Sequence, residues 1–195
     1  MEFRKMRRAA QELDHEACLE MIQRATSGVL SVIGDGGYPY GVPLSFVYVD
    51  GKAGSGEDLA AAGDGSAEDT VVAGDGSIGK FYFHCAKTGH KIDALRACDK
   101  ACFTIIDRDD VVADEFTTYF KSVIAFGHVR ILETREEIMP AIRMLADRYS
   151  PDESDEKKSA EIDREFAGLA MLELTVEHMT GKEAVELMRK RKKYE

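Results

Sequence analysis

The feature that most constrains the fold is a series of apolar runs, rich in β-branched and aromatic residues, that are separated by short turns. Glycine and proline clusters bound these runs, and no regular alternation with helix-length segments accompanies them. This spacing is typical of antiparallel sheets and disfavours a doubly wound parallel sheet. We therefore predict a mainly β protein, a six-stranded antiparallel barrel with flanking helices. The runs cover 28–33, 38–49, 81–86, 101–107, 117–132 and 169–181.

Short helices are expected around this barrel. Residues 14–25 predict an amphipathic helix with Asp14 as its N-cap. Thr134 and Glu137 have the spacing of a capping box, which predicts a helix that continues to about residue 149. The charged stretch 150–159 predicts a loop, and the basic C-terminal stretch predicts a solvated helix. Gly127, inside a long strand, predicts a bulge or a close backbone approach.

Length and composition indicate one domain. A chain of 195 residues, 44% hydrophobic and 32% charged, can bury a sizeable core, and we expect 1–195 to form a single domain. Residues 53–79 are rich in glycine, alanine and acids and contain no aromatic or basic residue. This composition predicts an acidic, flexible insertion in a β-hairpin loop. Its repeated AGDGS string is faintly similar to a calcium loop but lacks the full ligand spacing.

Charge and cysteine content limit the class of partner. A formal net charge of -10 argues against a general nucleic-acid binder. No apolar run approaches the roughly 18 residues of a membrane span, and the N-terminus has no apolar segment typical of a secretory signal. The four cysteines have neither the density of a disulfide scaffold nor the spacing of a zinc site. We therefore expect a cytoplasmic protein with free thiols, no metal site and a small-molecule ligand.

The stretch 83–93, FHCAKTGHKID, predicts a strand that ends in a Thr-Gly turn and leads into a helix. Free backbone N–H groups at the start of a helix favour an anion. Thr88, His90 and Lys91 add a hydroxyl and cations, while Gly89 permits close backbone approach. This combination suits the phosphate of a mononucleotide. The alternative is that Thr88 merely caps a helix whose first turn carries exposed lysines.

His84 is the most informative histidine. Side chains alternate along a strand, so His84 is expected to face away from Phe83 and Cys85. If its face lines a cavity, the imidazole could hydrogen-bond a flavin edge or a bound substrate. The alternative is a structural histidine whose ring is satisfied within the sheet.

Two further stretches could present polar groups to a flat ring. The 43–46 stretch, PLSF, combines a proline-interrupted backbone with the Ser45 hydroxyl. Tyr119, Lys121 and Ser122 offer polar side chains on a second long strand. The alternative for both is an ordinary set of sheet residues.

Taken in order, the segments GYPYGVPLSF, YFHCAKTGHK and TGKEA resemble the FMN-binding split-barrel proteins. The resemblance is to the branch related to pyridoxamine 5'-phosphate oxidase and the nitroimidazole-resistance (Nim) proteins, and it covers nearly the whole chain apart from 53–79. It implies a split β-barrel that forms a homodimer, with two FMN sites at the subunit interface.

The resemblance also implies roles for individual residues. Lys91 resembles the phosphate-contacting lysine of the family, and His84 matches the active-site histidine of the Nim proteins. No arginine is present in YGVPLSFVYV, where pyridoxamine 5'-phosphate oxidase has an arginine-rich strand, so oxidation of pyridoxamine phosphate is not expected. The expected cofactor contacts are Pro43, Leu44, Ser45, Phe83, His84, Cys85, Ala86, Thr88, Gly89, His90, Lys91 and Tyr119, with Lys121, Ser122 and Val123 from the partner chain.

The leading hypothesis is therefore a flavoprotein that holds FMN and passes electrons to a small acceptor. Nitro-group reduction is one activity that fits, with His84 positioning or protonating the substrate. One alternative is a non-catalytic protein that binds haem or another planar cofactor on the same barrel. Another is an interaction protein whose acidic insertion binds a partner.

Overall fold

The structure, a computed structural model, describes residues 2–51 and 78–193. Most of the predicted insertion, 53–77, lies outside the described residues. Its last two residues belong to the hairpin itself, because Gly79 begins a strand and pairs with Asp50. The segments on either side of the insertion thus form the antiparallel hairpin that the sequence predicts.

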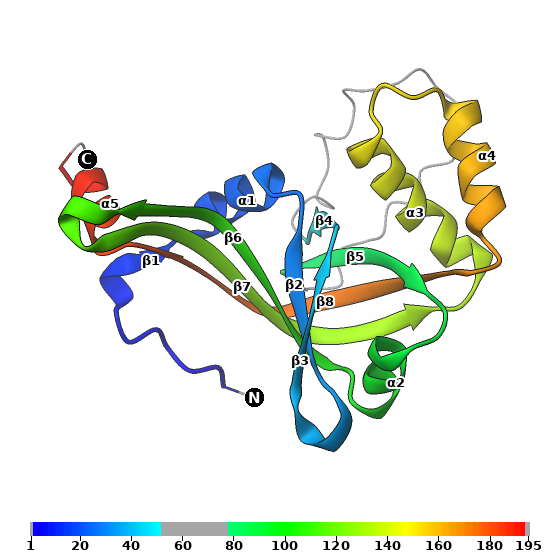
Figure 1. The fold of residues 1–195 in the computed structure, drawn as a ribbon, viewed down its shortest axis with the longest axis horizontal. Coiled ribbons are helices and arrows are strands. Elements are labelled where there is room, and N and C mark those ends of the chain that lie inside the picture. The colour runs from blue at the N-terminus through cyan, green and yellow to red at the C-terminus, as the bar shows by residue number, and fades with distance from the viewer. Residues whose placement is uncertain (1, 52–77, 194–195) are drawn as a thin grey trace.

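Antiparallel strands dominate the described residues and form one sheet with the order β3-β2-β6-β7-β8-β5-β4, with β1 paired to β8 (Figure 1). The mainly β prediction is confirmed, but this part of the chain contains eight strands and not six. The strands are β1 (Glu12–Leu13), β2 (Gly28–Ile33), β3 (Pro39–Leu44), β4 (Val47–Asp50), β5 (Gly79–Ala86), β6 (Lys100–Val112), β7 (Thr117–Leu132) and β8 (Leu169–Glu183).

The two edge strands of this order, β3 and β4, are consecutive in the chain and are joined by Ser45 and Phe46 alone. The sheet must therefore curl until its two edges meet at this junction, although no strand pairing joins β3 to β4 among the described residues. This arrangement is an incompletely closed barrel. The Ser45–Phe46 junction splits the predicted 38–49 strand in two, which accounts for one of the additional strands.

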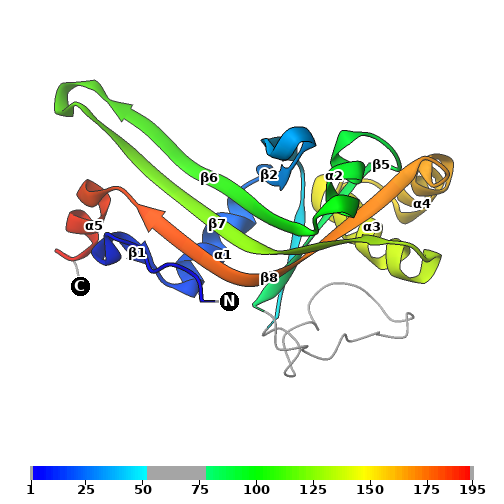
Figure 2. The ribbon, with the colours of Figure 1, turned by 90° about the horizontal axis from the view of Figure 1, so that it is seen from below.

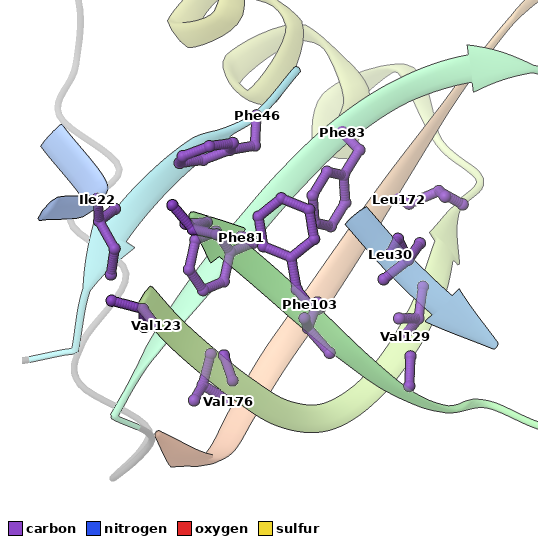
Figure 3. Packing of buried hydrophobic residues seen from close by; sticks show 14 of the residues in the cluster. Ile22, Leu30, Phe46, Phe81, Phe83, Phe103, Val123, Val129, Leu172 and Val176 are labelled. Atoms are coloured by element: carbon purple, nitrogen blue, oxygen red, sulfur yellow. The ribbon is translucent and has the colours of Figure 1, made fainter. Parts of the chain in front are cut away.

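An aromatic cluster fills the barrel (Figure 3). Phe46, Phe81, Phe83 and Phe103 are each 0% exposed. The centroid of the Phe103 ring lies 5.2 Å from that of the Phe46 ring, 5.1 Å from that of the Phe81 ring and 4.8 Å from that of the Phe83 ring. Burial of one such side chain contributes about 1.5–3 kcal/mol to folding. Phe81 and Phe83 point into this core, and His84, the residue after Phe83, points outward as predicted.

Helices pack around the sheet (Figure 1). Asp14 caps the first helix through the Ala17 N–H, and Thr134 with Glu137 forms the predicted capping box. The prediction of a loop over 150–159 is wrong, because a helix begins at Asp155 with Ser154 as its N-cap. The helices are α1 (His15–Arg24), α2 (His90–Ala97), α3 (Arg135–Tyr149), α4 (Asp155–Glu165) and α5 (Val185–Arg191).

Strands β6 and β7 form a long hairpin that projects beyond the rest of the sheet (Figure 2). Its turn residue Phe116 has a φ of 51° and is 97% exposed. The pairing of β7 with β8 shifts between Phe126 and Gly127, which confirms the predicted bulge. Among the described residues, no helix is both long and apolar enough to cross a membrane.

Candidate functional site: a cavity at His84 and an exposed turn at α2

A cavity of about 570 Å³ lies where the β3–β4 junction and β5 meet helices α3 and α4. Ser45 and His84, which the sequence places on different strands, both line it. The structure therefore brings together two of the predicted site residues. The apolar part of the lining comes from the two helices and the start of β8: Ile142, Leu145, Ala146, Ile162 and Leu169.

Charged side chains also line this cavity, and each of them has an ion-pair partner. Lys157 Nζ lies 2.6 Å from Glu153 Oε2, and Lys158 Nζ lies 2.8 Å from Asp147 Oδ1. The Lys158 side chain is only 9% exposed, so its stem covers part of the apolar wall. Because these cations and carboxylates neutralise each other locally, the cavity suits an uncharged, partly apolar molecule.

His84 lies on β5 opposite Met171 of β8 and is exposed to this cavity. No described residue forms a hydrogen bond or ion pair with its ring. This geometry does not support the alternative of a histidine that is satisfied within the sheet. A neutral imidazole carries one donor and one acceptor nitrogen, so the ring can both hold and move a proton at the cavity wall.

The predicted phosphate turn precedes α2. Gly89 is the N-cap with a φ of 117°, and no side chain caps the helix. Thr88 is therefore not a cap, which removes that alternative reading of the turn. The Ile92 N–H donates to the Gly89 carbonyl at 2.9 Å, so the N–H groups of His90 and Lys91 are the ones that remain available as donors. A Cβ added at Gly89 would meet nothing within 4 Å, so the turn faces open space.

Two side chains of this turn have partners on other elements. The His90 ring accepts a hydrogen bond from the Asp35 N–H at 3.1 Å and stacks on Tyr40 with 4.3 Å between the ring centroids. That ring is therefore held against the β2–β3 turn. Burial raises the pKa of the Cys85 thiol, and the nearby Lys91 ammonium opposes this rise. Lys91 thus lies beside the end of β5, next to the free N–H groups.

The predicted residues on β7 form a second group. The Tyr119 hydroxyl donates to Glu115 at 2.7 Å and accepts from Lys190 at 3.2 Å. The start of β7 lies at the end of the molecule that carries α5, whereas α3 and α4 lie at the other end (Figure 1). One chain therefore does not bring these residues to the His84 cavity.

Two of the predicted contacts have fully buried side chains. Phe83 and Val123 are 0% exposed and belong to the hydrophobic core, so only their backbone could contact a ligand. Lys121 and Ser122, next to Val123, are partly exposed. The predicted contacts that are exposed near the cavity and the α2 turn are Pro43, Ser45, His84, Ala86, Thr88, Gly89 and His90.

The part of the cavity wall that comes from α3 and α4 was not predicted from the sequence. Neither Tyr149 of α3 nor Glu165 of α4 was among the predicted site residues, yet both line the cavity. The only available signal was the wide apolar face of 135–149. Within the described residues, no group of three or more His, Cys, Asp or Glu side chains could hold a metal ion.

Comparison with known proteins identifies the family. The family model described as pyridoxamine 5'-phosphate oxidase matches residues 14–183. Among solved structures, a candidate 5-nitroimidazole antibiotic resistance protein from Bacteroides thetaiotaomicron is 20% identical with a TM-score of 0.61; the alignment covers 88% of this chain and 85% of that one. A conserved hypothetical protein from Mycobacterium tuberculosis is 15% identical with a TM-score of 0.68, covering 94% and 92%.

A FAD and heme binding protein from Mycobacterium smegmatis is 15% identical, with a TM-score of 0.61 and coverage of 90% and 74%. A comparison with curated protein sequences finds no match. At these identities the solved structures establish a shared fold, which agrees with the split barrel predicted from the sequence. The family match extends over most of the chain, and the chain belongs to the pyridoxamine 5'-phosphate oxidase family.

Proposed function

We propose that this chain is an FMN-dependent oxidoreductase that acts on a small molecule in the His84 cavity. The observation that carries the proposal is the meeting of Ser45 and His84 at one cavity wall. Family membership supports a flavin, and the structurally similar protein from Mycobacterium smegmatis is described as binding FAD and heme. The mixed apolar and polar lining is typical of sites for small organic molecules.

The residues present fit FMN. The uncapped start of α2 and the Lys91 ammonium would bind the phosphate, and the open space at Gly89 leaves room for it. The backbone of 43–45, with the neighbouring 83–86 strand end, would hold the ring. When bound, the flavin supplies the electron transfer. His84 would hold a substrate oxygen or nitrogen by a hydrogen bond and move a proton to it, as in reduction of a nitro group.

A homodimer would complete the site. Lys121 and Ser122 lie away from the cavity of their own chain, so a second copy is needed to bring such residues to it. The hairpin that carries them has large exposed apolar side chains, with Ile106 64% and Val111 76% exposed. Burial of these side chains against a second copy would stabilise the dimer.

The test is an absorbance spectrum of the full-length protein purified from cells, followed by release and chromatography of the chromophore. The proposal predicts two flavin bands and FMN in the released fraction. A Soret band would favour the non-catalytic haem protein, and released FAD would correct the cofactor. A colourless protein that neither binds nor quenches added FMN would contradict the proposal.

A further inference from the structure

We infer that Tyr149 is a positioning residue, whose hydroxyl fixes the β3–β4 junction where the flavin ring is proposed to lie. The inference rests on the proposed function, since it concerns the same cavity. Tyr149 ends α3 and lines the cavity together with Ser45 and His84. Tyr149 is not among the residues proposed to contact FMN.

The Tyr149 hydroxyl makes a set of contacts with backbone groups on two other segments. It accepts a hydrogen bond from the Phe46 N–H at 3.0 Å, and its own proton can be donated to Phe46 O at 2.9 Å or Thr26 O at 2.7 Å. One hydroxyl therefore holds the Phe46 N–H and, through its single proton, either the Phe46 carbonyl or the Thr26 carbonyl in the segment that leads into β2. Ser45, the neighbour of Phe46 at the cavity wall, is held indirectly.

These contacts matter because strand pairing among the described residues does not reach the junction. Ser45 and Phe46 lie between β3 and β4, so the strand pairing that orders those two strands does not extend to them. The Phe46 ring is buried in the aromatic core, which fixes the side chain but leaves its backbone polar groups to be satisfied. The Tyr149 hydroxyl accepts from the N–H and can donate to the carbonyl, and in this way it holds the backbone that presents Ser45 to the cavity.

The preceding residue anchors the same end of α3. The Arg148 guanidinium donates to Ile22 O at 3.0 Å and Ala25 O at 2.6 Å, the free carbonyls at the end of α1. Its charge also lies 4.9 Å above the centre of the Phe46 ring. The helix end that carries the Tyr149 hydroxyl is thus fixed on α1, which makes it a rigid support for the junction.

The experiment compares Tyr149→Phe with Ile138→Val in the full-length protein, with FMN as the probe. Tyr149→Phe keeps the ring and removes the hydroxyl, whereas Ile138→Val weakens the packing of α3 at a buried residue outside the cavity. FMN affinity is measured by quenching of flavin fluorescence. The visible spectrum of bound FMN is recorded at saturation, and thermal unfolding is followed for both variants.

We expect Tyr149→Phe to weaken FMN binding about threefold to tenfold, the size of one lost hydrogen bond, and to shift the bound-flavin spectrum. Ile138→Val should lower the melting temperature but leave affinity and spectrum unchanged. If Tyr149→Phe matches wild type in both flavin readouts, Tyr149 is only structural and the inference is wrong. If the wild type binds no flavin, the proposed function fails as well.

Hydrogen exchange of the wild type gives a second measurement that needs no variant. The Phe46 amide should be protected without FMN, because Tyr149 already accepts from it. Rapid exchange of that amide in the FMN-free protein would also overturn the inference.

Discussion

Replacement of Gly127 by alanine should destabilise the protein more than most single substitutions. Gly127 lies at the bulge of β7, and a Cβ placed there would come within 1.9 Å of the Thr175 carbonyl oxygen. That oxygen belongs to β8, whose Thr175 pairs with both His128 and Lys80. The β8 backbone at Thr175 therefore has a paired strand on each side and cannot move away from Gly127 without a large cost in free energy.

The geometry sets the size of the effect. An ordinary contact of this kind is 3.4–4 Å long, so the two backbones must separate by roughly the difference between 1.9 Å and 3.4 Å. Overpacking a tightly packed site costs about 1–3 kcal/mol, and a rigid backbone neighbour argues for the upper end, about 3 kcal/mol. For a chain of this size, such a loss lowers the melting temperature by roughly 6–12 °C.

The matched control is Gly168→Ala, between α4 and β8. A Cβ at Gly168 would have Glu165 O as its nearest neighbour, at 3.9 Å, so the change in the free energy of unfolding should stay within about 0.5 kcal/mol. Both variants are compared by urea and thermal unfolding of the full-length protein. If Gly127→Ala unfolds at the same midpoint as Gly168→Ala, the reasoning about the bulge is wrong.

Two further predictions concern the site and the thiols. His84→Ala should leave FMN affinity within about twofold of wild type, because the imidazole does not contact the phosphate. The same change should slow reoxidation of the reduced flavin by a nitroimidazole about a hundredfold, because the imidazole supplies a proton. Stopped-flow absorbance measures the reoxidation rate, and an unchanged rate would exclude His84 as the proton donor. Burial, with Asp14 and Glu12 nearby, raises the pKa of Cys18 to about 11, so its unreactive thiol form persists well above neutral pH. Iodoacetamide at pH 8 should therefore label half-buried Cys98 and spare Cys18 until the protein is denatured, and equal labelling by mass spectrometry would contradict this.

Local patterns predicted much of this fold because they reflect local physics. The long run 117–132 coincides with β7, and the capping box of α3 forms as its spacing indicated. Strand β1 could not be predicted, since two residues carry no periodicity and its pairing partners lie at the far end of the chain. Helix α4 was missed because Ile162 is its one buried residue, so it has almost no apolar stripe.

The site was predictable only where its residues are close in sequence. The turn before α2 was identified from Gly89 and its neighbours, and the structure confirms that a helix begins there. The engagement of His90 by Asp35, far earlier in the chain, depends on tertiary packing and left no trace in the sequence. The same holds for Tyr149, which reaches Phe46 only after α3 has packed on the barrel.

The most direct test of the account compares FMN with riboflavin, which lacks the phosphate, in wild type and Lys91→Ala. If the α2 turn binds the phosphate, wild type should bind FMN at least about tenfold more tightly than riboflavin, since hydrogen bonds to charged groups contribute about 1.5–3 kcal/mol. Lys91→Ala should lose most of that preference and keep its affinity for riboflavin. Equal affinities of the wild type for the two flavins would contradict the account.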